Sequence, residues 1–156
     1  MNTTTVLLIV HGLLAVALLG AITHQATSVW APARKPAGSF VGRFRAVPGA
    51  SYANAIIVLY LLAFLLGGII YPEYRIEVRT VVEQLGLWPQ NGAFELKEHF
   101  AAVGLGILPA YWHYWRQPLS EEHARTRAAL TAMLAFIVWW NFLVGHILNN
   151  IRGFGS

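Results

Sequence analysis

The stretch ANAIIVLYLLAFLLGGIIY, residues 53–71, runs for 19 residues without a charged side chain. A helix of this length reaches about 28 Å at 1.5 Å per residue, close to the roughly 30 Å hydrocarbon core of a bilayer. An apolar helix of that reach satisfies its own backbone hydrogen bonds inside lipid. The stretch therefore predicts a transmembrane helix.

Three further segments on either side of this stretch have the same character. Residues 5–29, 94–115 and 128–149 are long enough to cross the core, and Pro109 makes the third of them the least regular. Of the 156 residues, 56% are hydrophobic and 12% are charged, and the mean hydropathy is +0.52. This composition fits a bilayer better than water. The sequence predicts an all-α fold, with residues 1–156 forming a single integral membrane four-helix bundle.

The basic residues of the connections indicate how the bundle is oriented. The connection at residues 31–52 contains basic side chains and no acidic one, and the connection between the third and fourth spans is also rich in arginine; these residues are Arg34, Lys35, Arg43 and Arg45, then Arg116, Arg125 and Arg127. Connections of this kind face the cytoplasm. We expect both termini on the outer, periplasmic side of a bacterial inner membrane, and we expect the first apolar segment to be retained.

The segment between the second and third spans then also lies outside. Apolar residues recur in it at helical spacing beside charged ones, namely Val78, Val81, Val82 and Leu85 beside Arg79 and Glu83. This pattern predicts a short amphipathic helix on the membrane surface, capping the bundle.

Several function classes are excluded by composition. The chain has no Cys, so disulfides, thiolate metal sites and thiol catalysis are ruled out. The net charge of +4 is spread over the connections, which does not fit a nucleic-acid partner. No Gly-rich phosphate loop and no H-E-x-x-H helix is found, so nothing indicates a hydrolase.

The histidines are the most informative residues. Five of the six lie in the predicted spans, and they are His11, His24, His99, His113 and His146. A titratable ring is costly in hydrocarbon unless it is paired or ligated, so such residues indicate function. In the expected orientation His11, His99 and His146 lie in the outer half of the membrane, and His24 and His113 lie in the inner half. The sequence therefore predicts two layers of candidate ligands.

The spacing of these histidines fits stacked cofactors. The steps of 13 residues from His11 to His24 and of 14 residues from His99 to His113 each rise by about 20 Å. That separation suits two haems across a membrane, each held by two imidazoles from facing helices. Neutral imidazole also binds copper or zinc, so histidine alone leaves the metal open.

The spacing His99-x13-His113 resembles the ligand spacing in the cytochrome b subunit of quinol:cytochrome c oxidoreductases. The four-helix plan is also similar to small bacterial membrane cytochromes b that exchange electrons with quinone. The resemblance implies two parallel helices that each give one ligand to each of two haems b, with quinone as a possible second cofactor.

The pairing of the ligands is open in the outer layer. Fourteen residues turn a helix by about 320°, whereas thirteen turn it by about 220°, so His11 and His24 point to different sides. The inner pair is His24 with His113. His99 pairs with His11 or with His146, and His11 is our first choice. Arg116 could meet a haem propionate at the inner surface, and Lys97 or Arg152 could do so outside.

The leading functional hypothesis is a b-type cytochrome that transfers electrons across the bilayer, between haems and quinone or a partner redox subunit. Its expected partners are the lipid bilayer, the quinone pool, and other redox subunits or a second copy. Whether the chain is an enzyme by itself stays open. One alternative is a copper or zinc site of His11, His99 and His146. The other is a cofactor-free structural subunit of a respiratory or photosynthetic complex.

Overall fold

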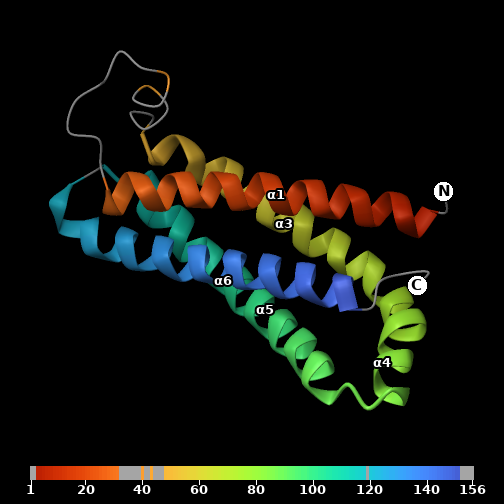
Figure 1. Ribbon diagram of the computed structural model, residues 1–156. Coiled ribbons are helices and arrows are strands. Elements are labelled where there is room, and N and C mark those ends of the chain that lie inside the picture. The colour runs from red at the N-terminus through yellow and green to blue at the C-terminus, as the bar shows by residue number, and fades with distance from the viewer. Residues whose placement is uncertain (1–2, 32–39, 41–42, 44–47, 119, 152–156) are drawn as a thin grey trace.

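The computed structural model describes residues 3–31, 40, 43, 48–118 and 120–151, and its regular elements are all helical (Figure 1). Within these ranges there is no strand, so the predicted all-α class is confirmed. Each of the four predicted segments lies inside one of four long helices. The elements in order are α1 Thr3–Trp30, α3 Ala50–Tyr74, a π-helical turn Arg75–Arg79, α4 Thr80–Gln84, α5 Trp88–Arg116, a 3-10 turn Glu121–His123 and α6 Ala124–Ile151.

Three of the long helices are long and apolar enough to cross a membrane, namely α1, α3 and α6. Their outward faces carry large apolar side chains, and Leu13, Leu65 and Ile147 are 65%, 61% and 55% exposed. A soluble bundle would carry polar residues there. The apolar exterior indicates a membrane protein.

Helix α5 is as long as the others but less apolar. Its first half contains the charged residues Glu95, Lys97 and Glu98 together with His99. Helix α5 is therefore not among the helices that are apolar enough to cross a membrane by composition. The crossing of the membrane by α5 therefore stays a prediction, as does the four-span topology that depends on it.

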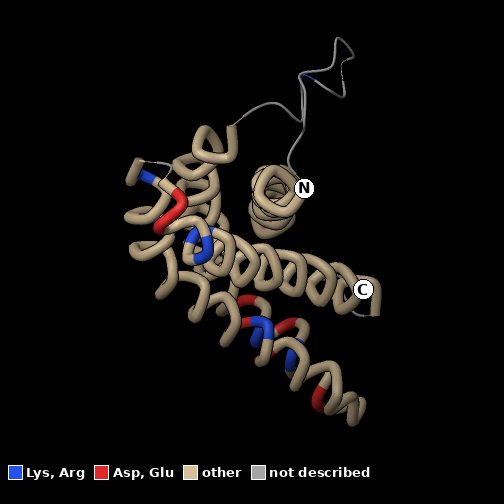
Figure 2. The backbone as a smooth tube through the Cα atoms, turned by 90° about the vertical axis from the view of Figure 1, so that its left-hand side faces the viewer, with Lys and Arg blue, Asp and Glu red and all other residues tan. Residues whose placement is uncertain are grey.

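The four long helices are arranged with α1 and α5 at opposite corners. Helix α1 packs against α3 and α6, and α5 packs against the same two helices. Figure 1 shows both chain ends at the end of the bundle where α4 lies. In Figure 2 the charged residues form one group near α4 and the start of α5 and another around the start of α6, and the helices between are uncharged. Which of these ends faces outward stays a prediction, and most of the basic 31–52 connection lies outside the described residues.

The tightly packed core lies at the end opposite to α4. Ile22, Ile56, Tyr111 and Leu134 are fully buried there, one from each long helix. Polar side chains inside this core are satisfied by each other, as low-dielectric surroundings require. The Tyr111 hydroxyl donates to Gln25 Oε1 at 2.5 Å, and Gln25 Nε2 donates to the Gly49 carbonyl at 3.0 Å. These bonds tie α5 to α1, and α1 to the start of α3.

A glycine on α5 allows the close approach of α3. A Cβ at Gly104 would collide with the Tyr60 hydroxyl, and that hydroxyl donates to the Ala101 carbonyl at 2.8 Å. Small residues at helix contacts have this role in membrane proteins. The Tyr60 contact sets the separation of α3 and α5 near the middle of the two helices.

The predicted amphipathic segment is helical, formed by the π-helical turn and α4. Val78 and Val82 are buried, whereas Leu85 is exposed. The Arg79 guanidinium donates to Glu83 and to Glu95, each at 2.8 Å, and so ties the segment to the start of α5. The segment closes one end of the bundle, although its apolar face is shorter than the sequence predicted.

Candidate functional site: an outer cavity

The bundle contains a cavity of about 960 Å³ at the end that carries α4. It opens because α5 diverges from α1 toward this end while the opposite end is tightly packed (Figure 1). All four long helices and the α4 segment contribute to its walls. A smaller cavity of about 110 Å³ shares His11, Lys97 and Asn141 with it and extends the space toward Leu18 and Val138. We refer to both together as the outer cavity, following the predicted orientation.

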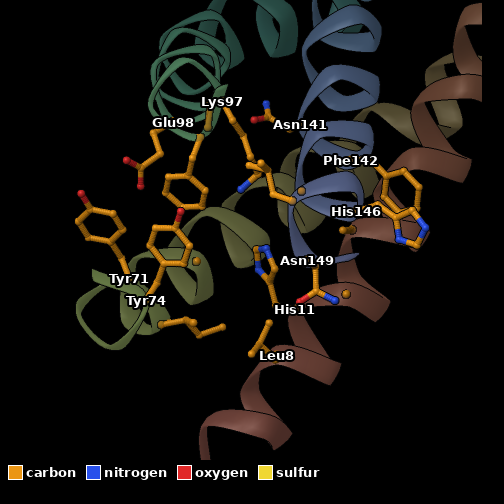
Figure 3. Close-up of a pocket in the computed structure, with 18 of the residues that line it drawn as sticks. Leu8, His11, Tyr71, Tyr74, Lys97, Glu98, Asn141, Phe142, His146 and Asn149 are labelled. Atoms are coloured by element: carbon orange, nitrogen blue, oxygen red, sulfur yellow. The ribbon is translucent and has the colours of Figure 1, made fainter. Parts of the chain in front are cut away.

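His11 is the central polar residue of the outer cavity. It is half-buried, and its Nδ1 atom is buried without a hydrogen-bond partner among the described residues. A Cβ at Gly67 would lie 3.3 Å from His11 Cε1, so the absence of a side chain at Gly67 makes room for the ring. Figure 3 shows the imidazole pointing into the open space between α3, α5 and α6. The ring lines the cavity, whereas its Nδ1 edge is buried against the α3 backbone at Gly67. The imidazole is the candidate ligand in this cavity.

His146 lies on the wall of the same cavity. It is an exposed residue of α6, and its ring lies parallel to that of Phe142 with centroids 6.3 Å apart. In Figure 3 His146 and Phe142 point toward α1, on the other side of α6 from Asn141. His11 and His146 therefore both line the outer cavity, but they come from different helices, and His146 is turned to the other side of α6. In the two-haem interpretation the sequence offered each of them only as a partner of His99.

His99 does not line the outer cavity. It is exposed on α5, and so is His113. The inward face of α5 is set by Gly104, Leu108 and Tyr111, which contact the core. His113 follows Gly104 by nine residues, a rotation of about 180°, so it points outward. The two histidines share one face of α5, as their spacing predicts, but that face is the outer surface.

The expected inner pair is not formed in this structure. His24 is 5% exposed, and its ring stacks on Tyr52 with centroids 4.4 Å apart. His113 lies at the surface beside Gln117, with 3.5 Å between their Nε2 atoms. The two residues therefore have separate surroundings. Arg116 is also exposed, with its guanidinium 4.6 Å from the centroid of the Trp112 ring.

A site of three histidines is not formed either. In the described part of the chain there is no group of three or more His, Asp or Glu side chains that could hold a metal ion. The His11, His99 and His146 set fails because His99 faces away from the cavity that the other two line. Copper or zinc in such a site is not favoured by this geometry.

Two further polar side chains point at the outer cavity, those of Lys97 and Asn141. Lys97 extends from α5 toward the space above His11, while its neighbour Glu98 points to the opposite side, toward Tyr71 (Figure 3). Asn141 donates from Nδ2 to the Ile137 carbonyl at 2.9 Å, which leaves its buried Oδ1 without a hydrogen-bond partner in the described structure. The cavity therefore combines apolar walls with a few converging polar groups.

The outer mouth of the cavity is aromatic. The rings of Tyr74 and Phe94 stack with centroids 3.8 Å apart, and Tyr71 lies 6.4 Å from both. These rings come from the end of α3 and the first turns of α5. A flat apolar ligand would find matching surfaces here.

No pattern in the sequence groups Tyr71, Tyr74 and Gln90 with the histidines. Tyr71 ends the predicted second span, and Tyr74 and Gln90 lie in the connection that follows it. The fold back of α4 onto α5 brings them to the cavity. The inward direction of Lys97 can be inferred from its spacing in the sequence. It precedes Gly104 by seven residues, so both lie on the inward face of α5.

Comparisons with protein-family models, with curated proteins and with solved structures find no match to this chain. The assignment of a function therefore depends on the cavity and on the residues that line it.

Proposed function

We propose that this chain is a membrane-embedded b-type cytochrome subunit that holds a haem b in the outer cavity. In this proposal it passes electrons between that haem and quinone or a partner redox subunit. The observation that carries the proposal is the His11 imidazole, which lines a cavity of about 960 Å³ and points into it. Histidine is the common axial ligand of b-type haem in helical bundles.

The cavity fits such a group in size and chemistry. Its volume lies at the upper end of the roughly 300–1,000 Å³ that cofactor sites occupy, and most of its lining is apolar. Gly67 leaves room for the His11 ring against the α3 backbone. His146 also lines the cavity and would be the second histidine that holds the group.

The geometry favours one haem in each chain, whereas the sequence suggested two. The inner layer offers a packed core around His24, and His113 is on the lipid-facing side of α5. A second haem between these residues would require the Tyr52 ring and the Gln25 hydrogen bonds to be displaced.

When bound, haem would supply one-electron redox chemistry, and the chain would set the conditions for it. His11 would hold and orient the group, and the apolar walls from α1, α3 and α6 would exclude water. The aromatic mouth at Tyr74 and Phe94 would offer an edge where quinone can approach from the membrane. The proposal places α5 across the membrane, the termini outside and the chain in a bacterial inner membrane.

Replacement of individual histidines tests the assignment. We expect His11→Ala to lose the haem absorption bands, because it removes the ligand in the cavity. His146→Ala should keep haem but change its reduced spectrum, because it removes the second histidine that would hold the group. His99→Ala and His113→Ala should leave the spectrum unchanged, because both lie outside the cavity.

The opposite pattern would contradict the site. Loss of haem in His99→Ala or His113→Ala with retention in His11→Ala would place the cofactor on the outer face of α5. Copper or zinc in the intact protein would support the alternative of a non-haem metal site. If histidine variants affect only assembly with other subunits, the chain is a structural subunit.

A further inference from the structure

Lys97 is a cationic residue of the outer cavity whose side chain points at the open space. It is half-buried, and Figure 3 shows its side chain extending from α5 into the middle of the cavity. A Cβ at Gly145 would lie 3.3 Å from Lys97 Cε, so the methylene chain runs along the bare backbone of α6. Its Nζ lies 5.1 Å from the centroid of the Phe94 ring. The side chain is thus held inside the bundle on two sides.

Among the described residues no carboxylate lies within ion-pair distance of this ammonium, and the charge of Glu98 acts on it only without direct contact. The ion pairs found there both belong to Arg79, which takes Glu83 and Glu95. Glu98 is adjacent in sequence, but neighbouring helix positions diverge by about 100°, and its side chain points to the Tyr71 side of the cavity. The Phe94 ring is a weaker partner for a cation than a carboxylate is.

The other polar groups that face Lys97 do not supply a negative charge. They are the His11 ring from α1 and the Asn141 amide from α6. Below them the walls are apolar, from Ala15, Ala63 and Phe64. A charged side chain in such surroundings pairs with an opposite charge, because its desolvation is otherwise uncompensated.

We propose that Lys97 is an anion subsite, which binds the carboxylate of an amphipathic ligand whose apolar body fills the outer cavity. The ligand class follows from the two features of the site: one cation at the polar level of His11 and Asn141, and an apolar space of about 960 Å³. Two sources carry this chemistry, a haem propionate and the carboxylate of a fatty acid. The anion subsite rests on the proposed function only where the carboxylate is a propionate.

The first arm of the test uses haem and haem dimethyl ester, in which both propionate charges are removed by methyl esterification. The full-length protein in detergent is loaded with each, and dissociation constants are measured by absorption. We expect the wild-type protein to prefer haem about tenfold, as one charge-assisted contact would give. Lys97→Met should lose this preference, and Lys97→Arg should keep it.

The second arm uses cis-parinaric acid and its methyl ester. Energy transfer from the protein's tryptophans separates bound probe from probe dissolved in micelles. The same preference of about tenfold for the acid is expected in the wild-type protein, with its loss in Lys97→Met. Arg125→Met is the matched control in both arms, because it removes an exposed cation at the far end of α6.

The two arms separate the failure of this subsite from the failure of the haem proposal. Lys97-dependent preference in the haem arm identifies a propionate. Lys97-dependent preference for parinarate in a protein that binds no haem supports the subsite and overturns the cytochrome. If the wild-type protein binds each acid and its ester equally, or if Lys97→Met keeps the preference, the anion subsite is overturned. The comparison of acid and ester in the wild-type protein still tests the anion subsite if the Lys97→Met variant fails to fold.

Discussion

At the scale of single residues, the polar side chains of this bundle differ in how they are satisfied. Tyr111, Gln25 and the Gly49 carbonyl form a chain of hydrogen bonds at the packed end, although the buried Nη1 of Arg127 near that end has no hydrogen-bond partner among the described residues. His11 Nδ1 and Asn141 Oδ1 have none there either. The outer cavity is the place that suits a ligand, because apolar walls and a few polar side chains converge there.

The packed end gives a residue-scale prediction. Tyr111→Phe removes the hydroxyl that donates to the fully buried Gln25 and leaves its Oε1 unsatisfied. We expect a loss of about 1 kcal/mol in the free energy of unfolding, within the usual range for interhelical hydrogen bonds in membranes. Thermal unfolding in detergent measures it. Tyr114→Phe is the control, because its hydroxyl makes no hydrogen bond to any residue that the structure describes. An equal loss there would contradict the role of the Gln25 bond.

At the scale of helices, the separation of α3 and α5 depends on Gly104. We expect Gly104→Ala to destabilise the protein by about 1–3 kcal/mol, because the new Cβ collides with the Tyr60 hydroxyl. Gly106→Ala is the matched control, since its Cβ would meet nothing within 4 Å and alanine is the better helix former. Thermal unfolding of both variants tests the contact. A stable Gly104→Ala protein would mean that the two helices do not approach at this point.

The helices were predictable from the sequence, and the partners of the histidines were not. Apolar length alone predicts all four long helices, since each span needs about 20 residues to cross the core. Which residues face each other across the bundle depends on the rotation of each helix about its axis. In α5 this rotation is fixed by Gly104, Leu108 and Tyr111, which pack inward. That rotation of α5 turns His99 outward and Lys97 inward. The sequence interpretation used only the depth of each residue in the membrane, which does not distinguish the two directions. The cavity itself arises from the divergence of α1 and α5, which no local pattern encodes.

At the scale of the whole molecule, the absence of Cys allows the topology to be mapped by single substitutions. Cysteines placed at Thr3, Leu85 and Ser120 are each exposed and lie near the ends of the long helices. We expect a membrane-impermeant maleimide to label intact cells of the Thr3→Cys and Leu85→Cys variants. Ser120→Cys should be labelled only after the membrane is opened. Labelling of Leu85→Cys and Ser120→Cys from the same side would show that α5 does not cross.

The central claim is that the outer cavity holds a haem on His11, and the haem content of the purified wild-type protein tests it most directly. A pyridine haemochrome assay on the detergent-purified, full-length chain, together with a reduced-minus-oxidised spectrum, counts haem b in each chain. The cavity predicts about one haem b in each chain. An intact protein with no haem, purified with haem supplied during expression, would contradict the claim.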